Sequence, residues 1–186
     1  MDSLVNYGAL PQSYEDPAHK DALTGLLGDG DPLDVCDISA TPRATGAVYQ
    51  VKVLGALAMI DGGETDGKLL AVRTDDPLAA LVDDVGAPGL PAQVQKAMDD
   101  IRHWFRVYKV PEGKGENDIA FGGKWLDLDT ALRVVASGEE QWEALRKGPA
   151  REGVWAGSAG ARGEGLKAHQ VAPSACLRGV AAGTGA

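Results

Sequence analysis

The sequence is poor in the features that mark secreted and membrane proteins. It has only two cysteines among 186 residues, Cys36 and Cys176, too few for a disulfide framework. No apolar run approaches the roughly 18 residues that cross a bilayer, and the N-terminus lacks the regions of a secretory signal peptide. These absences predict a reducing compartment and no membrane partner, so we expect a soluble, cytoplasmic protein.

Positive charge is also scarce. The chain carries 18 Lys and Arg against 27 Asp and Glu, for a formal net charge of -9 at pH 7. Such a surface repels the phosphates of nucleic acids, so we expect no nucleic-acid partner. A small anionic substrate would need local metal ions and a few basic side chains to overcome the same repulsion.

Two common kinds of site are missing as well. No Gly-x-x-x-x-Gly-Lys-Ser/Thr segment is present, which argues against a P-loop nucleotide site. The three histidines, His19, His103 and His169, are far apart in the sequence, and none pairs with a cysteine at the spacing of a zinc site. Histidine-based metal or nucleophile chemistry is therefore not expected.

Acidic side chains, in contrast, form two clusters beside β-like segments. In the first, Asp29, Asp31 and Asp34 lie around Gly30 and Pro32, which cannot continue a helix and therefore predict a turn. Carboxylates held close together repel one another unless cations neutralise them, and oxygen ligands suit magnesium or calcium. The alternative for this cluster taken alone is a solvated acidic turn.

The second cluster, residues 61–68, follows the apolar run 51–60. We expect two acidic loops that meet at one end of a sheet or barrel. An EF-hand is excluded because Leu33 and Ala40 occupy the fifth and twelfth loop positions, which need oxygen ligands. Residues 33–38 alternate between apolar and acidic, which predicts a strand with Asp34 and Asp37 on opposite faces. Four other acids in or near these clusters are interpreted as solvated or structural, namely Asp37, Glu64, Asp75 and Asp76.

Four motifs in order give the chain a family resemblance. Asn6-Tyr7-Gly8, the turn at 29–34, the acidic segment 61–68 and Tyr108-Lys109 together resemble the soluble inorganic pyrophosphatases of family I, nearest to the eukaryotic type. The segments 10–17 and 104–111 also resemble the eukaryotic type of this family. The resemblance implies a pyrophosphatase-like domain over residues 1–147. It also implies Mg2+-dependent hydrolysis of inorganic pyrophosphate, or diphosphate, to two phosphates.

The resemblance assigns roles to five acidic residues of the motifs. Asp29, Asp34 and Asp66 would bind the activating metals, and Asp61 with Asp66 would bind metal that arrives with the substrate. Asp31 would be the general base that accepts a proton from the attacking water.

Four further residues match family positions that contact phosphate oxygens, namely Tyr7, Lys68, Tyr108 and Lys109. Each also has an ordinary interpretation: Tyr108 ends an apolar helical stripe, Lys109 suits the end of a helix, and Lys68 alone would be a surface lysine. Gly67 departs from the family, where an aromatic residue is usual, and we expect less packing beside Asp66.

The predicted fold is α+β and mainly β. Strands are expected at 48–60, with a bulge or bend at Gly55, and at 68–73, which suits a small OB-like barrel. Periodic apolar residues predict a helix over 92–109 and another over 128–147, both packed outside the barrel. Asp127 or Asp129 would cap the second helix. Residues 148–186 are Gly/Ala-rich without periodicity, and we expect a disordered tail.

The beginning of the chain leaves the function open between alternatives. By resemblance, a sizeable segment precedes the Asn-Tyr-Gly motif and supplies barrel strands, two glutamates, a lysine and an arginine. Here the motif begins at residue 6, so the chain reads as N-terminally truncated and its barrel as incomplete. A catalytically inactive pyrophosphatase-like protein, which binds metal, phosphate or full-length subunits, is the competing hypothesis. An unpaired barrel edge favours association, so a homo-oligomer is among the expected partners. A calcium-binding domain is the third hypothesis.

Overall fold

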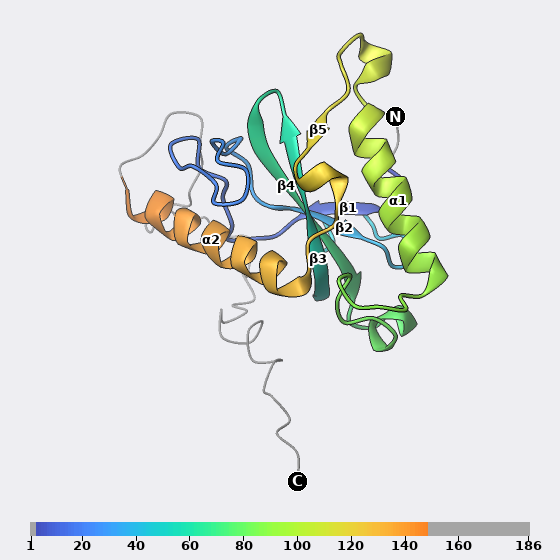
Figure 1. Cartoon of the computed structure of the whole chain (residues 1–186). Helices are drawn as coiled ribbons and strands as arrows, with labels where there is room; N and C mark the ends of the chain where they lie inside the picture. The colour runs from blue at the N-terminus through green and yellow to red at the C-terminus, as the bar shows by residue number, and fades with distance from the viewer. Residues whose placement is uncertain (1–2, 149–186) are drawn as a thin grey trace.

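A five-stranded sheet with an α-helix on each face makes up the part of the chain described by the computed structural model, residues 3–148 (Figure 1). The strands are β1 (Asn6–Ala9), β2 (Asp34–Asp37), β3 (Val51–Asp61), β4 (Glu64–Arg73) and β5 (Asp118–Ile119). The α-helices are α1 (Ala92–Val107) and α2 (Leu128–Lys147), and three 3-10 helices are η1 (Pro77–Ala80), η2 (Val110–Glu112) and η3 (Phe121–Gly123).

The long hairpin β3–β4 forms the centre of the sheet. The strand order is β1-β2-β4-β3-β5, in which β2 and β4 are parallel and the other pairs antiparallel. The register shifts between Val53 and Gly55, which confirms the predicted bulge. Strand β4 begins at Glu64 rather than at residue 68, so the prediction of a second acidic loop was wrong. Gly62 and Gly63 have φ angles of 60° and 91°, and they close the hairpin in a tight turn.

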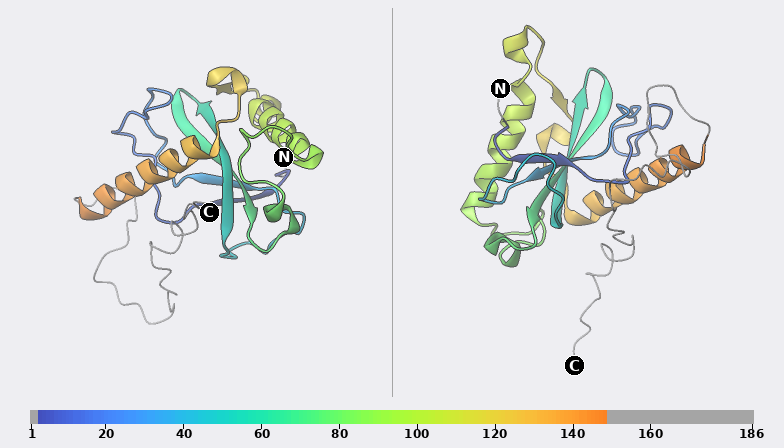
Figure 2. Two further views of the ribbon diagram at one scale, coloured as in Figure 1. Left: turned by 60° about the horizontal axis from the view of Figure 1, so that its bottom comes forward. Right: turned by 180° about the vertical axis from the view of Figure 1, so that it is seen from behind.

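The two helices cover opposite faces of this sheet, as Figure 2 shows from two further directions. Helix α1 buries Val94, Ile101 and Phe105 in one core cluster with sheet residues such as Leu70. Helix α2 buries Ala131 in a second cluster with residues of β2, β3 and β4. The prediction of two outer helices is therefore confirmed.

The helix boundaries follow local rules. Helix α2 spans the predicted residues, and the side chain of Asp127 caps it by accepting a hydrogen bond from the Thr130 N–H at 2.9 Å. Helix α1 ends at Val107, two residues before the predicted end, and Pro111 lies in the following turn.

The sheet stays open within residues 3–148, because β1 and β5 form its two edges and do not pair with each other. This matches the expected incomplete OB-like barrel. The predicted tail at 148–186 lies, apart from Gly148, outside the described residues. No helix in the described part of the chain is long and apolar enough to cross a membrane.

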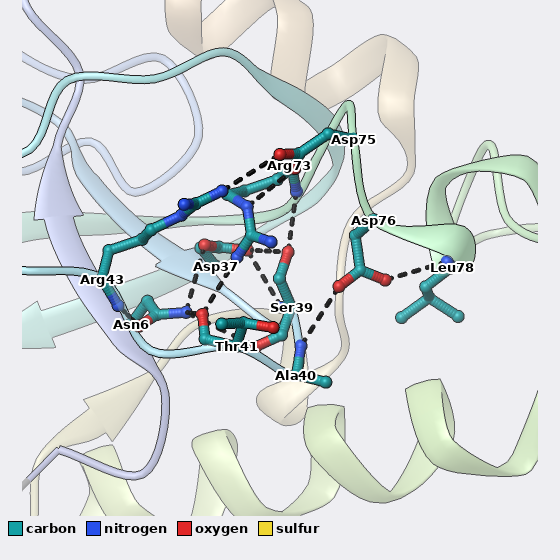
Figure 3. A network of polar contacts seen from close by, with 10 residues as sticks. All are labelled: Asn6, Asp37, Ser39, Ala40, Thr41, Arg43, Arg73, Asp75, Asp76 and Leu78. Carbon is teal, nitrogen blue, oxygen red and sulfur yellow. Dashed lines mark hydrogen bonds and ion pairs between the residues drawn. The ribbon is translucent and has the colours of Figure 1, made fainter.

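A polar network fixes the end of β2 that lies away from Asp34 (Figure 3). Asp37 is only 1% exposed, and it accepts hydrogen bonds from the Ser39 hydroxyl at 2.5 Å and from Asn6 at 3.3 Å. Arg73, at the end of β4, donates to Asp75 at 2.8 Å and to the Thr41 carbonyl at 3.0 Å. Asp37 is thus a structural acid, and the network ties β1, β2 and β4 together beyond the acidic region.

Candidate active site

Four of the predicted site residues project from one face of the sheet. Asp34 on β2 is the direct partner of Lys68 on β4, so their side chains share a face. Asp66 lies two residues before Lys68 and pairs with Met59, which lies two residues before Asp61. Since side chains alternate along a strand, all four point to the face covered by α1.

Lys68 lies at the centre of this face. The side chain is only 2% exposed, and its Nζ lies 2.5 Å from Asp34 Oδ2 and also pairs with Asp66. Burial disfavours the charged lysine, but Asp66 and Asp34 outweigh it and raise the pKa of Lys68. The ammonium also lies 5.2 Å from the centre of the Phe105 ring. The interpretation of Lys68 as a surface lysine is therefore wrong.

Tyr7 on the edge strand β1 also reaches Asp34, to which its hydroxyl donates a hydrogen bond. Burial and this hydrogen bond both raise the pKa of Tyr7, because each disfavours the phenolate. Asp34 therefore accepts from a lysine and a tyrosine at once.

A similar arrangement surrounds Asp61 at the end of β3. The Tyr108 hydroxyl lies 3.2 Å from Asp61 Oδ2, and Lys109 Nζ forms an ion pair with the same oxygen. The Tyr108 ring stacks on Trp104, with 4.8 Å between ring centres. Burial raises the pKa of Asp66 against the opposing effect of Lys68, and the nearby carboxylates of Asp34 and Asp61 raise it further.

The acidic turn brings Asp29 toward β4. Gly30 has a φ of 90°, which favours glycine, and the Asp29 carboxylate accepts a hydrogen bond from the Asp31 N–H at 3.0 Å. Burial raises the pKa of Asp29 to about 6. The Asp31 side chain is exposed in the same turn.

Three carboxylates converge where this turn meets β4. Oxygens of Glu15, Asp29 and Asp66 all lie within 4.8 Å of one another. A donor set made only of carboxylate oxygens suits a hard divalent cation, and the burial of Glu15 and Asp66 makes their mutual repulsion costly without one. The residues present therefore fit a metal ion.

Glu15 is the member of this cluster that sequence reasoning missed as a site residue. It is only 7% exposed, and burial raises its pKa to about 8. No periodicity marks it, because it lies in the loop between β1 and β2 and reaches β4 only through the fold. The sole signal was its place in the segment 10–17 that contributed to the resemblance.

A cavity of about 500 Å3 lies away from these carboxylates. It is lined by α1 residues, including Arg102 and Arg106, and by residues 116–119 and 122–123. Both arginines already pair, with Asp99 and Glu116. The two arginines of this cavity are therefore already neutralised by neighbouring acids.

Comparison with known proteins decides the family. A family model described as inorganic pyrophosphatase matches residues 1–143. The chain belongs to the inorganic pyrophosphatase family. The inorganic pyrophosphatase of Homo sapiens is 47% identical over 144 residues, which cover 76% of this chain and 48% of that protein. For the inorganic pyrophosphatase of Yarrowia lipolytica the identity is 45% over 149 residues, or 80% of this chain and 51% of that protein.

Solved inorganic pyrophosphatases share the fold. The recombinant enzyme from T brucei brucei superposes with a TM-score of 0.74 at 36% identity, covering 78% of this chain and 42% of that one. An N-terminal domain truncated vacuolar soluble pyrophosphatase of Trypanosoma cruzi, in complex with PPi, gives a TM-score of 0.72 at 38% identity over 78% of this chain and 54% of that one. The chain thus spans about half the length of the curated pyrophosphatases that it matches.

Proposed function

We propose that this chain acts as an inorganic pyrophosphatase, hydrolysing inorganic pyrophosphate to two phosphates with Mg2+ in the cytoplasm. One observation carries the proposal: each of the four residues expected to contact phosphate oxygens forms a hydrogen bond or ion pair with a candidate metal ligand. Tyr7 and Lys68 contact Asp34, and Tyr108 and Lys109 contact Asp61. Donors and ligands therefore lie next to each other on one face, as a site for a metal-bound phosphate requires.

The carboxylates would hold the metal ions. Asp29, Asp34 and Asp66 are proposed to bind the activating Mg2+, and Asp61 with Asp66 the Mg2+ that enters with the substrate. Bound Mg2+ would neutralise the anionic oxygens and acidify a water molecule. Asp31, exposed in the acidic turn, is proposed to accept the proton of the attacking water.

The donors would then serve the phosphate groups. Without metal, Lys68 neutralises Asp34 and Asp66, and Lys109 neutralises Asp61. When these carboxylates take other partners, both ammonium groups and the two tyrosine hydroxyls become available to anionic oxygens. The site would then present two ammonium groups to the substrate beside the metal ions, although the chain carries a net charge of -9.

The relatives and the cysteines support the remaining parts of the proposal. A structure of a related Trypanosoma cruzi pyrophosphatase contains PPi, which is the substrate that we propose. Cys36 is buried and forms no disulfide within residues 3–148, in line with a reducing compartment such as the cytoplasm.

Loss of one acid tests the proposed general base. We expect Asp31→Asn to lower phosphate release from pyrophosphate in excess Mg2+ by about 100-fold or more, within the range for loss of a proton acceptor. Asp100→Asn is the matched control, because Asp100 forms only an exposed ion pair with Lys96 on α1, and it should keep full activity. Equal activities of the two variants would contradict the role of Asp31.

A further inference from the structure

The backbone of Glu15 is fixed to the acidic turn. Its N–H donates to the Asp31 carbonyl at 2.9 Å, and its carbonyl accepts from the Gly30 N–H at 2.9 Å. Gly28 lies so close that a Cβ there would approach the Glu15 carbonyl carbon and oxygen to 2.3 Å. A shift of Glu15 would therefore move the turn that carries Asp29.

The side chain of Glu15 is fixed to β4. Its Oε1 accepts a hydrogen bond from the Gly67 N–H at 3.1 Å, and thus holds the peptide group that follows Asp66. This N–H lies between two backbone contacts of β4, the bridge from Thr65 to Gly28 and the pairing of Lys68 with Asp34. Glu15 takes the place of a strand partner in that interval.

Gly67 allows the close approach. A Cβ at this position would lie 3.2 Å from Glu15 Oε1 and 3.9 Å from Leu33 Cδ2. The space that an aromatic residue was expected to fill is therefore already contacted by Glu15 and Leu33. With glycine in place of an aromatic residue, the peptide group between Asp66 and Gly67 is still held by its hydrogen bond to Glu15.

We propose that Glu15 is a positioning residue of the metal site, which sets the separation between Asp29 and Asp66 through its hydrogen bond to Gly67 and its backbone bonds to the acidic turn. This inference rests on the proposed function, since it assumes that these two aspartates share a metal ion. Oxygens of Glu15, Asp29 and Asp66 all lie within 4.8 Å of one another, so the Glu15 side chain is close enough to both aspartates to influence their separation.

Two substitutions separate positioning from direct ligation. Glu15→Gln keeps an oxygen that accepts from Gly67, so its Mg2+ affinity should stay within about threefold of the unmodified chain. Glu15→Ala removes the acceptor, and Mg2+ affinity should fall by about 10- to 100-fold, as for loss of other residues that orient metal ligands. Isothermal titration calorimetry with Mg2+ alone, without substrate, measures both. Glu64→Gln is the control, because Glu64 is exposed at the start of β4 and should bind Mg2+ like the unmodified chain.

Two results would overturn the proposal. One is a Glu15→Gln variant that binds Mg2+ as weakly as Glu15→Ala, which would mean that the charge of Glu15 contacts the ion. The other is a Glu15→Ala variant with unchanged affinity. The amide signal of Gly67 in a 15N NMR spectrum reports the hydrogen bond directly, and it should move in Glu15→Ala and stay in Glu15→Gln. The Mg2+ titrations contain no pyrophosphate, so their results do not depend on catalysis. If the unmodified chain fails to hydrolyse pyrophosphate in a separate assay, that failure counts against the proposed function and not against the positioning role of Glu15.

Discussion

At the scale of single residues, the site is neutralised by its own lysines. Lys68 is almost fully buried between Asp34 and Asp66, and any cation that binds these oxygens must replace its ammonium group. Removal of one partner from a buried ion pair typically destabilises a protein by about 3–5 kcal/mol, because the remaining charge loses its partner. Lysine and metal ion therefore compete for the same carboxylates.

Lys68→Met tests this competition. In EDTA the variant should lose about 3–5 kcal/mol of unfolding free energy. Mg2+ should then bind at least about tenfold more tightly than to the unmodified chain, since a neighbouring positive charge is gone. Chemical denaturation with and without Mg2+, together with calorimetry, measures both effects. Weaker Mg2+ binding by the variant would contradict the competition between Lys68 and the metal ion. Hydrolysis by the variant should be slower, because a side chain expected to contact phosphate oxygens is lost.

Some of these residue contacts were predictable and others were not. The acidic motifs and Tyr108-Lys109 are visible as short segments, so their association could be expected from the resemblance. The bond from Glu15 to Gly67 joins residues far apart in the sequence, and it depends on how the loop between β1 and β2 folds back on β4. No local pattern encodes such a contact.

At the scale of elements, the central hairpin sets the geometry of the site. Gly55 marks the bulge in β3, where two other segments cross the strand. Ala56 exchanges backbone hydrogen bonds with Leu126, and Val85 donates to the Leu54 carbonyl at 2.9 Å. A Cβ at Gly55 would lie 2.2 Å from Val85 Cγ2 and 2.6 Å from the Leu126 carbonyl oxygen. The two crossing segments therefore leave no room for a side chain at position 55.

Gly55→Ala should therefore destabilise the chain by about 3 kcal/mol, the upper part of the range for overpacking. Gly115→Ala is the control, since nothing lies within 4 Å of a Cβ at Gly115, and its effect should stay within about 0.5 kcal/mol. Urea denaturation followed by circular dichroism compares the two. A Gly55→Ala variant as stable as the control would show that β3 does not need the close crossing.

The elements also show where the sequence was informative. Helix α2 matched its predicted range because its apolar spacing and the Asp127 cap are local signals. The turn between β3 and β4 was missed because acidic residues on both sides of Gly62-Gly63 resembled a loop. Positive φ at two adjacent glycines is, however, what a two-residue hairpin requires.

At the scale of the whole molecule, buried acids couple folding to pH. In the metal-free fold the pKa of Glu15 is raised from 4.5 to about 8, and that of Asp29 from 3.8 to about 6, in both cases mainly by burial. Both groups hold protons more tightly when folded than when unfolded. Their contribution to stability is therefore complete below their ordinary pKa values and is lost as pH rises through about 6 and then about 8.

We therefore expect the melting temperature in EDTA to fall as pH rises from about 5 to about 8.5, the interval that these two pKa shifts define. Excess Mg2+ should reverse the fall at the upper end, because metal binding favours the ionised acids. Glu15→Gln should show a flatter profile than the unmodified chain. Thermal denaturation across this interval measures the effect, and a melting temperature in EDTA that rises with pH would contradict the raised pKa values.

We propose that the carboxylate face formed by β2, β3, β4 and the acidic turn is sufficient for pyrophosphate hydrolysis. The most direct measurement is phosphate release from pyrophosphate by the purified 186-residue chain, with excess Mg2+ and with EDTA. Phosphate release should continue over many turnovers in Mg2+ and stop in EDTA. No release from a folded chain that binds Mg2+ would contradict this proposal and favour the catalytically inactive alternative.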